Sequence, residues 1–329
     1  MPDRQRLVLV LAVLLSAAVG AILLALSAGS LVLPFLDVLR ALGGKGEADA
    51  AAIILELRLP RVIATFACGG LLATAGALMQ VLLRNPLADP YILGISGGAA
   101  VGALGAITLG AATFWIDASA FAGALAAMLV VFGLAHGDGS WTQTRLLLTG
   151  VIVAAGCGAA VSLMLALAPD TRVMSMLFWM MGDASAAARP WPALVVLALA
   201  LVAVMPFARD LNVLARGELS ARALGVRVGH LRVALYVLAS LLTATSVTLV
   251  GSVGFVGLVV PHLVRLVLGN DQRVLIPAAA LAGGTLLTLA DTAARTVIAP
   301  QQLPVGVLTA LIGVPVFLFL LSRGSRISR

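Results

Sequence analysis

Charge is scarce in this chain, and its scarcity narrows what the chain can be. Only 11% of the 329 residues are charged, Lys45 is the single lysine, and the mean hydropathy is +1.12. A soluble domain has about a quarter of its residues charged, so the composition predicts a polytopic membrane protein. The net charge of +7 is spread along the chain and is not gathered in one segment, which argues against binding to nucleic acid.

Reactive side chains are also few. Three histidines, His136, His230 and His262, have no metal-ligand spacing with one another, so no metal site is predicted. A glycine-rich phosphate loop ending in Lys and Ser or Thr is missing, which excludes a P-loop ATPase. Cys68 and Cys157 both lie in apolar runs and are interpreted as packing residues without a disulfide. We therefore expect neither an enzyme nor a chain that binds its own cofactor.

Long apolar runs make up most of the remaining sequence. A transmembrane helix needs about 20 mostly apolar residues. The first run follows two arginines but has no clear cleavage site, so it is interpreted as a retained helix and not as a signal peptide. The ten predicted spans are Leu7–Ala28, Val62–Leu83, Tyr91–Leu109, Phe114–Ala135, Leu146–Leu167, Trp191–Phe207, Leu231–Val250, Val253–Leu268, Val274–Ile298 and Val305–Leu321. No linker separates a second domain, so residues 1–329 are predicted to form one all-α unit.

The distribution of arginines predicts the orientation of these spans. With the N-terminus in the cytoplasm, twice as many basic residues fall inside as outside, as the positive-inside rule requires. An even number of spans then places the C-terminus in the cytoplasm as well. Two further helices are expected on the outer face, one within Leu31–Gly44 and one in the segment that contains Phe178 and Trp179.

One cytoplasmic loop is unusually basic for so apolar a chain. The stretch "ARGELSARALGVRVGHLR", Ala215 to Arg232, lies between the sixth and seventh predicted spans. Its spacing predicts a short helix from Glu218 to Leu224 that ends at Gly225, because glycine is the residue most suited to ending a helix. Topology alone would explain the arginines, but the helical pattern beside them favours a docking surface.

Several motifs together resemble a known family. The stretches are RLPR, NPLADPYILGISGG, LFWMMGD, ALGV, GFVGLVVPHLVRL and LADTAARTVIAPQQLPVGVLTALIGVPVFLFLL, in that order from about Leu57 to the end. The chain resembles the FecCD-type permeases, the transmembrane subunits of ABC importers for haem, iron-siderophores and vitamin B12. The resemblance implies the ten-helix vitamin B12 importer-like permease fold in the bacterial cytoplasmic (inner) membrane. It also implies a homodimer, two cytoplasmic ABC ATPase subunits that hold ATP and Mg²⁺, and a periplasmic substrate-binding protein.

The resemblance assigns roles to residues at both ends of the spans. The basic loop would dock into the ATPase through Arg216, Glu218, Leu219, Arg222, Ala223, Leu224 and Gly225. Asn85 and Leu87 would narrow the pore as a cytoplasmic gate, with Thr144 as a further candidate, although Asn85 before proline could be a simple turn residue.

On the outer side, Arg58, Arg61 and Arg295 would pair with glutamates of the binding protein. The alternatives are membrane anchoring for Arg58 and Arg61, and a local pair between Arg295 and Asp291.

The predicted cargo is an iron chelate. Arg172, Met176, Trp179 and Met180 lie near the outer end of the fifth span, and methionine and aromatic walls with one arginine suit haem. These residues could equally be surface and packing residues. Haem import is the first expectation, with a ferric siderophore or vitamin B12 as alternatives. A different class, a secondary transporter driven by an ion gradient, would need a mid-membrane carboxylate, and the spans are almost free of ionisable groups.

Overall fold

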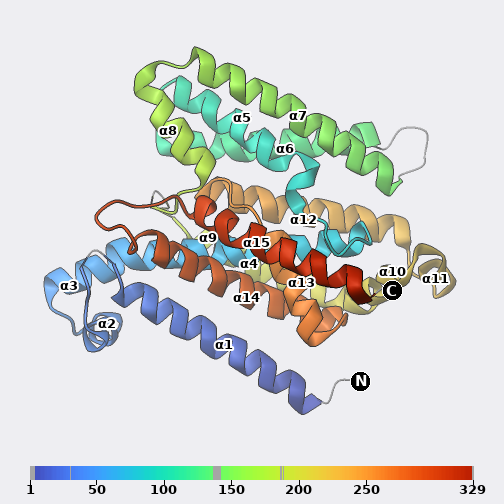
Figure 1. Cartoon of the computed structure of the whole chain (residues 1–329), viewed down its shortest axis with the longest axis horizontal. Helices are drawn as coiled ribbons and strands as arrows, with labels where there is room; N and C mark the ends of the chain where they lie inside the picture. The colour runs from blue at the N-terminus through green and yellow to red at the C-terminus, as the bar shows by residue number, and fades with distance from the viewer. Residues whose placement is uncertain (1–3, 30, 136–141, 186, 188, 328–329) are drawn as a thin grey trace.

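The structure, a computed structural model, describes residues 4–29, 31–135, 142–185, 187 and 189–327, and these ranges contain helices and no strand (Figure 1). The α-helices are α1 (Arg4–Ser27), α2 (Phe35–Leu42), α3 (Ala48–Ala52), α4 (Leu59–Leu82), α5 (Ile95–Thr108), α6 (Thr113–Ala135), α7 (Gln143–Leu167), α8 (Asp170–Met181), α9 (Trp191–Val204), α10 (Ala208–Arg216), α11 (Glu218–Ala223), α12 (Val228–Val250), α13 (Val256–Leu268), α14 (Gln272–Ala294) and α15 (Val305–Ile327). Single turns of other helix types are η1 (Ile53–Arg58), η2 (Pro90–Leu93) and η4 (Met205–Phe207).

Each of the ten predicted spans coincides with an apolar helix. Seven of these helices are long and apolar enough to cross a membrane, and three shorter ones, in α5, α13 and α15, match the third, eighth and tenth predicted spans. The count of ten crossings therefore remains a prediction. The third span starts later than expected, at Ile95, because Gly94 has a φ of +74° and separates the η2 turn from α5. The two segments expected to form helices on the outer face are helical, as α2 and α8, and their side of the membrane remains a prediction.

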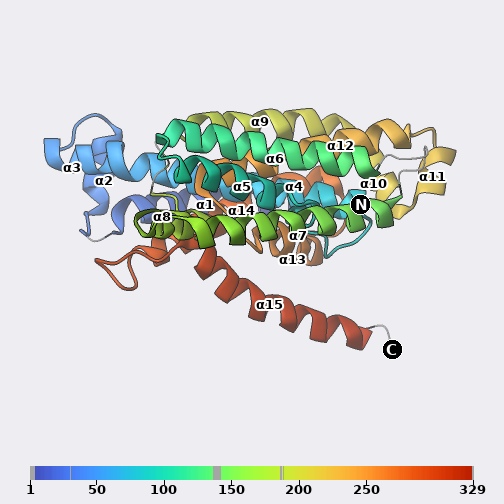
Figure 2. The same ribbon diagram turned by 90° about the horizontal axis from the view of Figure 1, so that it is seen from above.

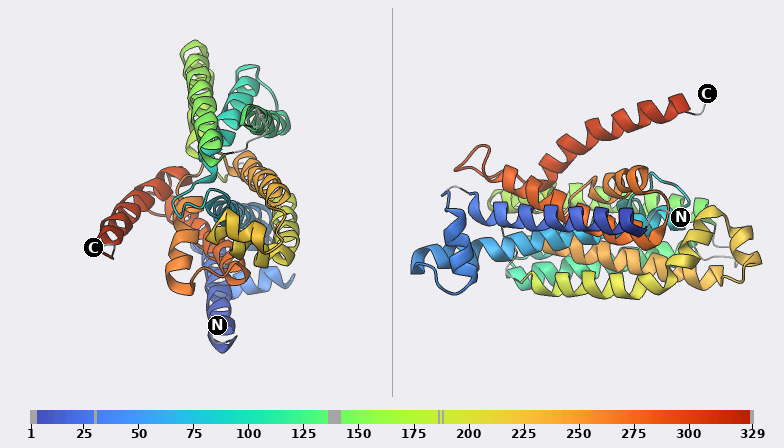
Figure 3. Two further views of the ribbon diagram at one scale, coloured as in Figure 1. Left: turned by 90° about the vertical axis from the view of Figure 1, so that its right-hand side faces the viewer. Right: turned by 90° about the horizontal axis from the view of Figure 1, so that it is seen from below.

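Helix α4 is the centre of the molecule. Its residues from Ala67 to Leu82 are all buried, and it packs against α14, α12, α13 and α9. A helix that is apolar on every side is stable only where other helices cover all its faces. Seen end-on in the left view of Figure 3, α5, α6 and α7 form a group on one side of the other helices.

Small residues let α4 approach its neighbours, as its sequence predicts. A Cβ atom on Gly69 would overlap the backbone of Gly283 in α14, and one on Gly76 would overlap Gly257 in α13. The first contact is reciprocal, since a Cβ on Gly283 would overlap the backbone of Gly69, whereas a Cβ on Gly257 would meet Pro90 and the backbone oxygen of Leu72. These glycines therefore set the distance between α4 and its partners.

The two ends of the molecule differ in character. The first turn of α1 and the last turn of α15 lie at the same end as α10 and α11, and α2, α3 and α8 lie at the opposite end (Figures 1 and 2). This arrangement agrees with termini on one side of the membrane, on the side of the basic loop. Which side is cytoplasmic remains a prediction from the arginine count.

Several helices, among them α1, α7, α9 and α15, carry apolar surface that the single chain does not cover. Figure 2 shows α15 leaning away from the bundle, and large apolar side chains are exposed along α7, α9 and α15. Examples are Ile152 on α7, Val202 on α9 and Leu311 on α15. In a membrane these faces meet lipid or another protein surface.

The glycine contacts predict a mutational result. Gly76→Ala should lower thermal stability in detergent, because overpacking a close contact costs about 1–3 kcal/mol. Gly20→Ala on α1 is the matched control, since a Cβ there meets nothing within 4 Å. Thermal unfolding of both purified variants is the measurement. Equal midpoints would contradict a tight contact between α4 and α13.

Candidate functional site

The predicted helix in the basic loop is confirmed. Helix α11 spans Glu218–Ala223, Leu224 caps it, and Gly225 follows with a φ of +82°. The amide of Gly225 donates to Arg222 O and that of Val226 to Ala221 O, which closes the helix end in the usual glycine-dependent way. Helix α10 precedes it, and Gly217, with a φ of +139°, separates the two.

Glu218 holds α11 to the transmembrane bundle. One carboxylate oxygen accepts from Arg222 at 2.7 Å and the other from Arg232, near the start of α12, at 2.6 Å. The Arg232 side chain is buried, whereas Arg222 is exposed. The partly buried Glu218–Arg232 pair is the one that holds α11 in place, because an exposed i,i+4 pair such as Glu218–Arg222 contributes little to stability. Glu218 therefore faces the protein and is not available on the outer side of α11.

The outer side of α11 is apolar at its centre and basic at its edges. Leu219 is 86% exposed and Leu224 70% exposed, and Ala223 is exposed with them. Arg216 and Arg222 are exposed at either end of the helix, and Arg227 follows it. Exposed leucines at the tip of a short helix are costly in water, so this surface fits a partner with an apolar groove and acidic rims.

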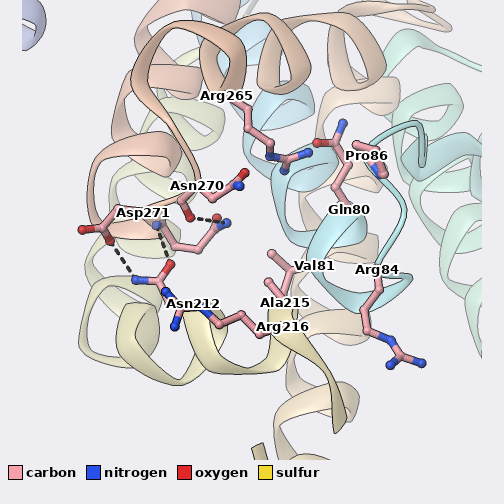
Figure 4. A pocket seen from close by; sticks show the side chains of 11 residues that line it. Gln80, Val81, Arg84, Pro86, Asn212, Ala215, Arg216, Arg265, Asn270 and Asp271 are labelled. Atoms are coloured by element: carbon pink, nitrogen blue, oxygen red, sulfur yellow. Dashed lines mark hydrogen bonds between the residues drawn. The ribbon is translucent and has the colours of Figure 1, made fainter. Parts of the chain in front are cut away.

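A side-chain clamp fastens α10 to α14. Asn212 Nδ2 donates to Asp271 Oδ1 at 2.8 Å, and the backbone amide of Gln272 donates to Asn212 Oδ1 at 2.8 Å. The Asp271 carboxylate also caps the start of α14 by accepting from the Arg273 amide. Both the nitrogen and the oxygen of the Asn212 side chain are thus hydrogen-bonded. These two bonds hold α10 and the start of α14 in one relative position (Figure 4).

A pocket of about 610 Å³ adjoins this clamp. Figure 4 shows its walls, with Arg265 extending from α13 toward Gln80 near the end of α4. Gln80 and Gln272 are buried, and the Oε1 atom of each has no hydrogen-bond partner in the described part of the chain. Pro86 reaches the same pocket, so the pocket joins the predicted gate loop to α10.

The predicted gate loop is a rigid turn between α4 and η2. The Asn85 side chain accepts from the Leu87 amide at 2.9 Å, which makes Asn85 the turn residue that its place before proline suggests. Asp89 caps the following turn by accepting from the Tyr91 amide. Burial raises the pKa of the Asp89 carboxyl to about 6, opposed by that hydrogen bond. Asn85 is exposed and Leu87 half-buried in the single chain.

The start of α7 lies against the same loop. Arg84 donates to Gln143 Oε1 at 3.1 Å, and Gln143 Nε2 donates to Leu82 O at 3.0 Å. Thr144 is therefore next to a residue that contacts the loop, and its side chain is exposed. The structure thus brings the three predicted gate residues to one region. Their role as a gate remains a prediction.

The three predicted docking arginines already have partners inside the chain. Arg58 is buried and donates to the backbone oxygens of Leu26 and Ser27 in the last turn of α1 and of Leu31 beyond it. Arg295 is buried too and donates to Ala25 O.

Arg61 forms a bidentate ion pair with Asp291, with a shortest N–O distance of 2.9 Å, and also donates to Gln302. The predicted Arg295–Asp291 pair is present at 3.7 Å, so Asp291 serves both arginines. Docking remains a prediction for all three residues.

The four residues predicted to contact the cargo do not line one common pocket. Arg172 and Trp179 line a pocket of about 700 Å³ between α6, α8 and the end of α12, together with Asp117, Asp183 and Arg189. Met180 lines a different hollow next to α15, and Met176 is fully buried in the core. Arg172 and Trp179 therefore remain a candidate pair for cargo contact, and Met176 has no exposed surface in this structure.

Neither cysteine is disulfide-bonded, as predicted, and Cys68 is buried beside Ser246. No group of three His, Cys, Asp or Glu residues that could hold a metal occurs in the described ranges. His136 lies outside them.

Sequence reasoning missed the clamp. The run Asn270–Asp271 is a recognisable helix-start signal, but nothing local marks Asn212 as its partner 59 residues away.

Comparison with known proteins gives consistent matches. The model of the FecCD transport family matches residues 11–323. The cobalamin import system permease of Halobacterium salinarum is 43% identical over 83% of this chain and 74% of its own length. The hemin transport system permease of Yersinia pestis is 41% identical over 82% and 83%, and the vitamin B12 import system permease of Escherichia coli is 38% identical over 93% and 92%. A solved structure described as an inward-facing metal-chelate type ABC transporter matches with a TM-score of 0.82 and 29% identity, covering 96% of this chain and 99% of that one.

The Glu218 anchor predicts a proteolysis result. Glu218→Gln should speed trypsin cleavage after Arg222 and Arg227, because the charge that holds α11 to Arg232 is lost while every cleavage site remains. Glu47→Gln, an exposed acidic residue at the opposite end, is the control. Cleavage rates followed by mass spectrometry decide the matter, and equal rates in both variants would show that the pair does not anchor α11.

Proposed function

The chain belongs to the FecCD transport family, and from this premise we propose that it is the membrane-spanning permease subunit of an ATP-driven importer. It carries out no covalent chemistry in this proposal, and ATP and Mg²⁺ are bound by a separate ATPase. The observation that carries the proposal is the exposed apolar surface of α11 between basic edges, at one end of a bundle of apolar helices. The proposed location is the cytoplasmic membrane.

In this proposal α11 docks into a groove of the ATPase. Leu219 and Leu224 supply the apolar contact, and Arg216, Ala223 and Arg222 border it. Glu218 and Gly225 do not contact the ATPase in this proposal. Glu218 ties the helix to Arg232, and Gly225 ends the helix. The ATPase thus grips a helix that is fixed to the bundle at its base.

The clamp supports a route from α11 to the gate. Motion of α11 passes to α10, and Asn212 holds α10 to the start of α14. Helix α14 touches α4 through Gly283 and Gly69, and α4 leads into the Asn85–Leu87 loop. Every step in this route is a direct contact between packed elements, which is the physical requirement for transmitting a small displacement.

A second copy of the chain completes the proposed pore. The exposed apolar faces of α7 and α15 are available to a partner, and the gate loop and Thr144 lie beside the first turn of α7. Two such loops facing each other would narrow a passage that a single chain leaves open on one side. A homodimer with two ATPase subunits is therefore the proposed assembly.

A periplasmic binding protein is the proposed donor of cargo. Arg58, Arg61 and Arg295 lie at the end of the molecule where it would dock, and their internal bonds favour a supporting role beneath that surface. Of the three, Arg61 has the most exposed hydrogen bond, the one to Gln302, but turning outward would leave the buried Asp291 carboxylate with Arg295 alone. Docking glutamates would compete with Asp291 for this side chain.

Haem is the proposed cargo, with a ferric siderophore or vitamin B12 as alternatives. The pocket that holds Arg172 and Trp179 combines aromatic walls, which include Phe178, with a cation for an acidic edge. The relatives divide between hemin and cobalamin transport, so they favour the class of large cyclic chelates over any one member.

An ion-driven transporter is the weaker alternative. Such proteins use carboxylates within the membrane that change their charge. Asp291 is held by Arg61 at 2.9 Å, and Asp117 lies in the second turn of α6 at its outer end. Neither is placed as an unpaired carboxylate at the middle of a span.

Uptake into liposomes tests the function. The chain, reconstituted with its ATPase and binding protein, should import one of haem, a ferric siderophore or cobalamin only when ATP is supplied. Leu219→Asp should abolish ATP-driven uptake, because a charge would enter an apolar groove, and Leu219→Met should retain it. Uptake that follows an ion gradient without ATP would overturn the proposal.

Crosslinking tests the gate. In a chain whose Cys68 and Cys157 are replaced by serine, Leu87→Cys should form a bond across the dimer, and its yield should change with the nucleotide on the ATPase. The exposed Leu36→Cys at the opposite end is the control. If the dimer is intact and Leu87→Cys forms no crosslink in any nucleotide state, the loop is not the gate.

A further inference from the structure

A second pocket lies at the α11 end of the molecule, between α9 and α10 on one side and α12 on the other. Its volume is about 740 Å³. Most of its walls are apolar, formed by Ala203, Val204, Phe207, Val213, Leu235 and Leu238. Neighbouring helices do not fill this space, and it is distinct from the clamp pocket on the other side of α10.

The mouth of this pocket is basic. Arg209 comes from α10, Arg227 from the turn after α11, and His230 from the first turn of α12, and all three are exposed. Neither arginine has an ion pair in the described part of the chain, and one acidic residue, Asp210, lines the same pocket. Two arginines and one histidine from three separate elements thus surround one apolar opening.

The pocket lies where the exposed apolar surface of α9 gives way to basic residues, which in a membrane would be the boundary between hydrocarbon and water. The adjoining face of α9 is exposed and apolar, as at Leu199 and Val202, which is the character of a lipid-facing helix. The basic residues lie beyond the end of that helix. An occupant must therefore have an apolar part that enters between α9 and α12 and an anionic part that remains at the mouth.

We infer that this pocket is a binding site for an anionic phospholipid. The acyl chain would lie against Phe207, Leu235 and Leu238, and the phosphate would meet Arg209 and Arg227. Basic pockets between helices on the cytoplasmic side are suited to anionic headgroups. An acidic segment of a protein would pair with the basic residues at the mouth but would leave the apolar walls of the pocket uncovered. A lipid is therefore the better match.

The site would also brace α11. Leu224 and Arg227 line this pocket and directly follow α11, so a bound lipid would support the helix from the membrane side. The inference does not depend on the proposed function, because lipid binding is measured on the chain alone.

Lipid retention tests the inference. The full chain is purified from nanodiscs of phosphatidylglycerol and phosphatidylcholine, and native mass spectrometry measures the lipids that stay bound. Replacing both Arg209 and Arg227 by alanine should weaken phosphatidylglycerol binding roughly 25-fold, at about fivefold for each basic residue lost. Arg273→Ala, an exposed arginine at the same end and outside the pocket, should leave it unchanged.

A second variant tests the apolar part independently. Ala234→Trp would fill the groove without changing any charge, and it should reduce phosphatidylglycerol retention as well. Glycerol phosphate, which has the anion without the chains, should not displace the lipid at equal concentration. The inference is overturned if the double variant retains phosphatidylglycerol, if Arg273→Ala loses it equally, or if glycerol phosphate displaces it while Ala234→Trp has no effect.

Discussion

The close backbone contact between α4 and its neighbours is the constraint on which the rest of the structure depends. Gly69 against Gly283 and Gly76 against Gly257 leave no room for a methyl group, so α4, α13 and α14 behave as one packed unit. Close packing of small residues is the main attraction available between helices in lipid, where apolar side chains gain nothing by leaving the solvent. Both candidate regions are attached to this unit, the gate loop through the end of α4 and α10 through the start of α14.

The few charged residues serve mainly to fix the ends of helices. Glu218 ties α11 to Arg232, and Asp291 ties α14 to Arg61 on α4. A buried pair of this kind is not a large source of stability compared with apolar packing, but losing one partner leaves the other unpaired at a high cost. Among the described residues, the buried charged side chains Arg58, Arg232, Asp291 and Arg295 each have a specific partner within the chain, whereas exposed ones such as Arg209 and Arg227 have no ion pair.

Much of the fold could be predicted from the sequence, and the reasons are local. Apolar length located the ten helices, and Gly225 marked the end of α11, because both signals depend on neighbouring residues alone. Long-range partners left no such signal. Asn212 and Asp271 are 59 residues apart and Arg61 and Asp291 are 230 apart, and only the packed bundle brings them together. The predicted local pair between Asp291 and Arg295 was correct, but the shorter contact with Arg61 was not visible in the sequence.

Arg58 and Arg295, which donate to the last turn of α1, have a consequence for how the chain is made. The carbonyls of Ala25, Leu26 and Ser27 belong to the last turn of α1 and have no amide partner further along that helix. Arg58, which contacts two of them, follows within 32 residues in the chain, but Arg295, which contacts the third, follows 270 residues later. During insertion α1 is therefore only partly secured, and it reaches its final seat when α14 has emerged from the ribosome. A truncation before Arg295 would leave the first helix of the protein without the bond that closes its last turn.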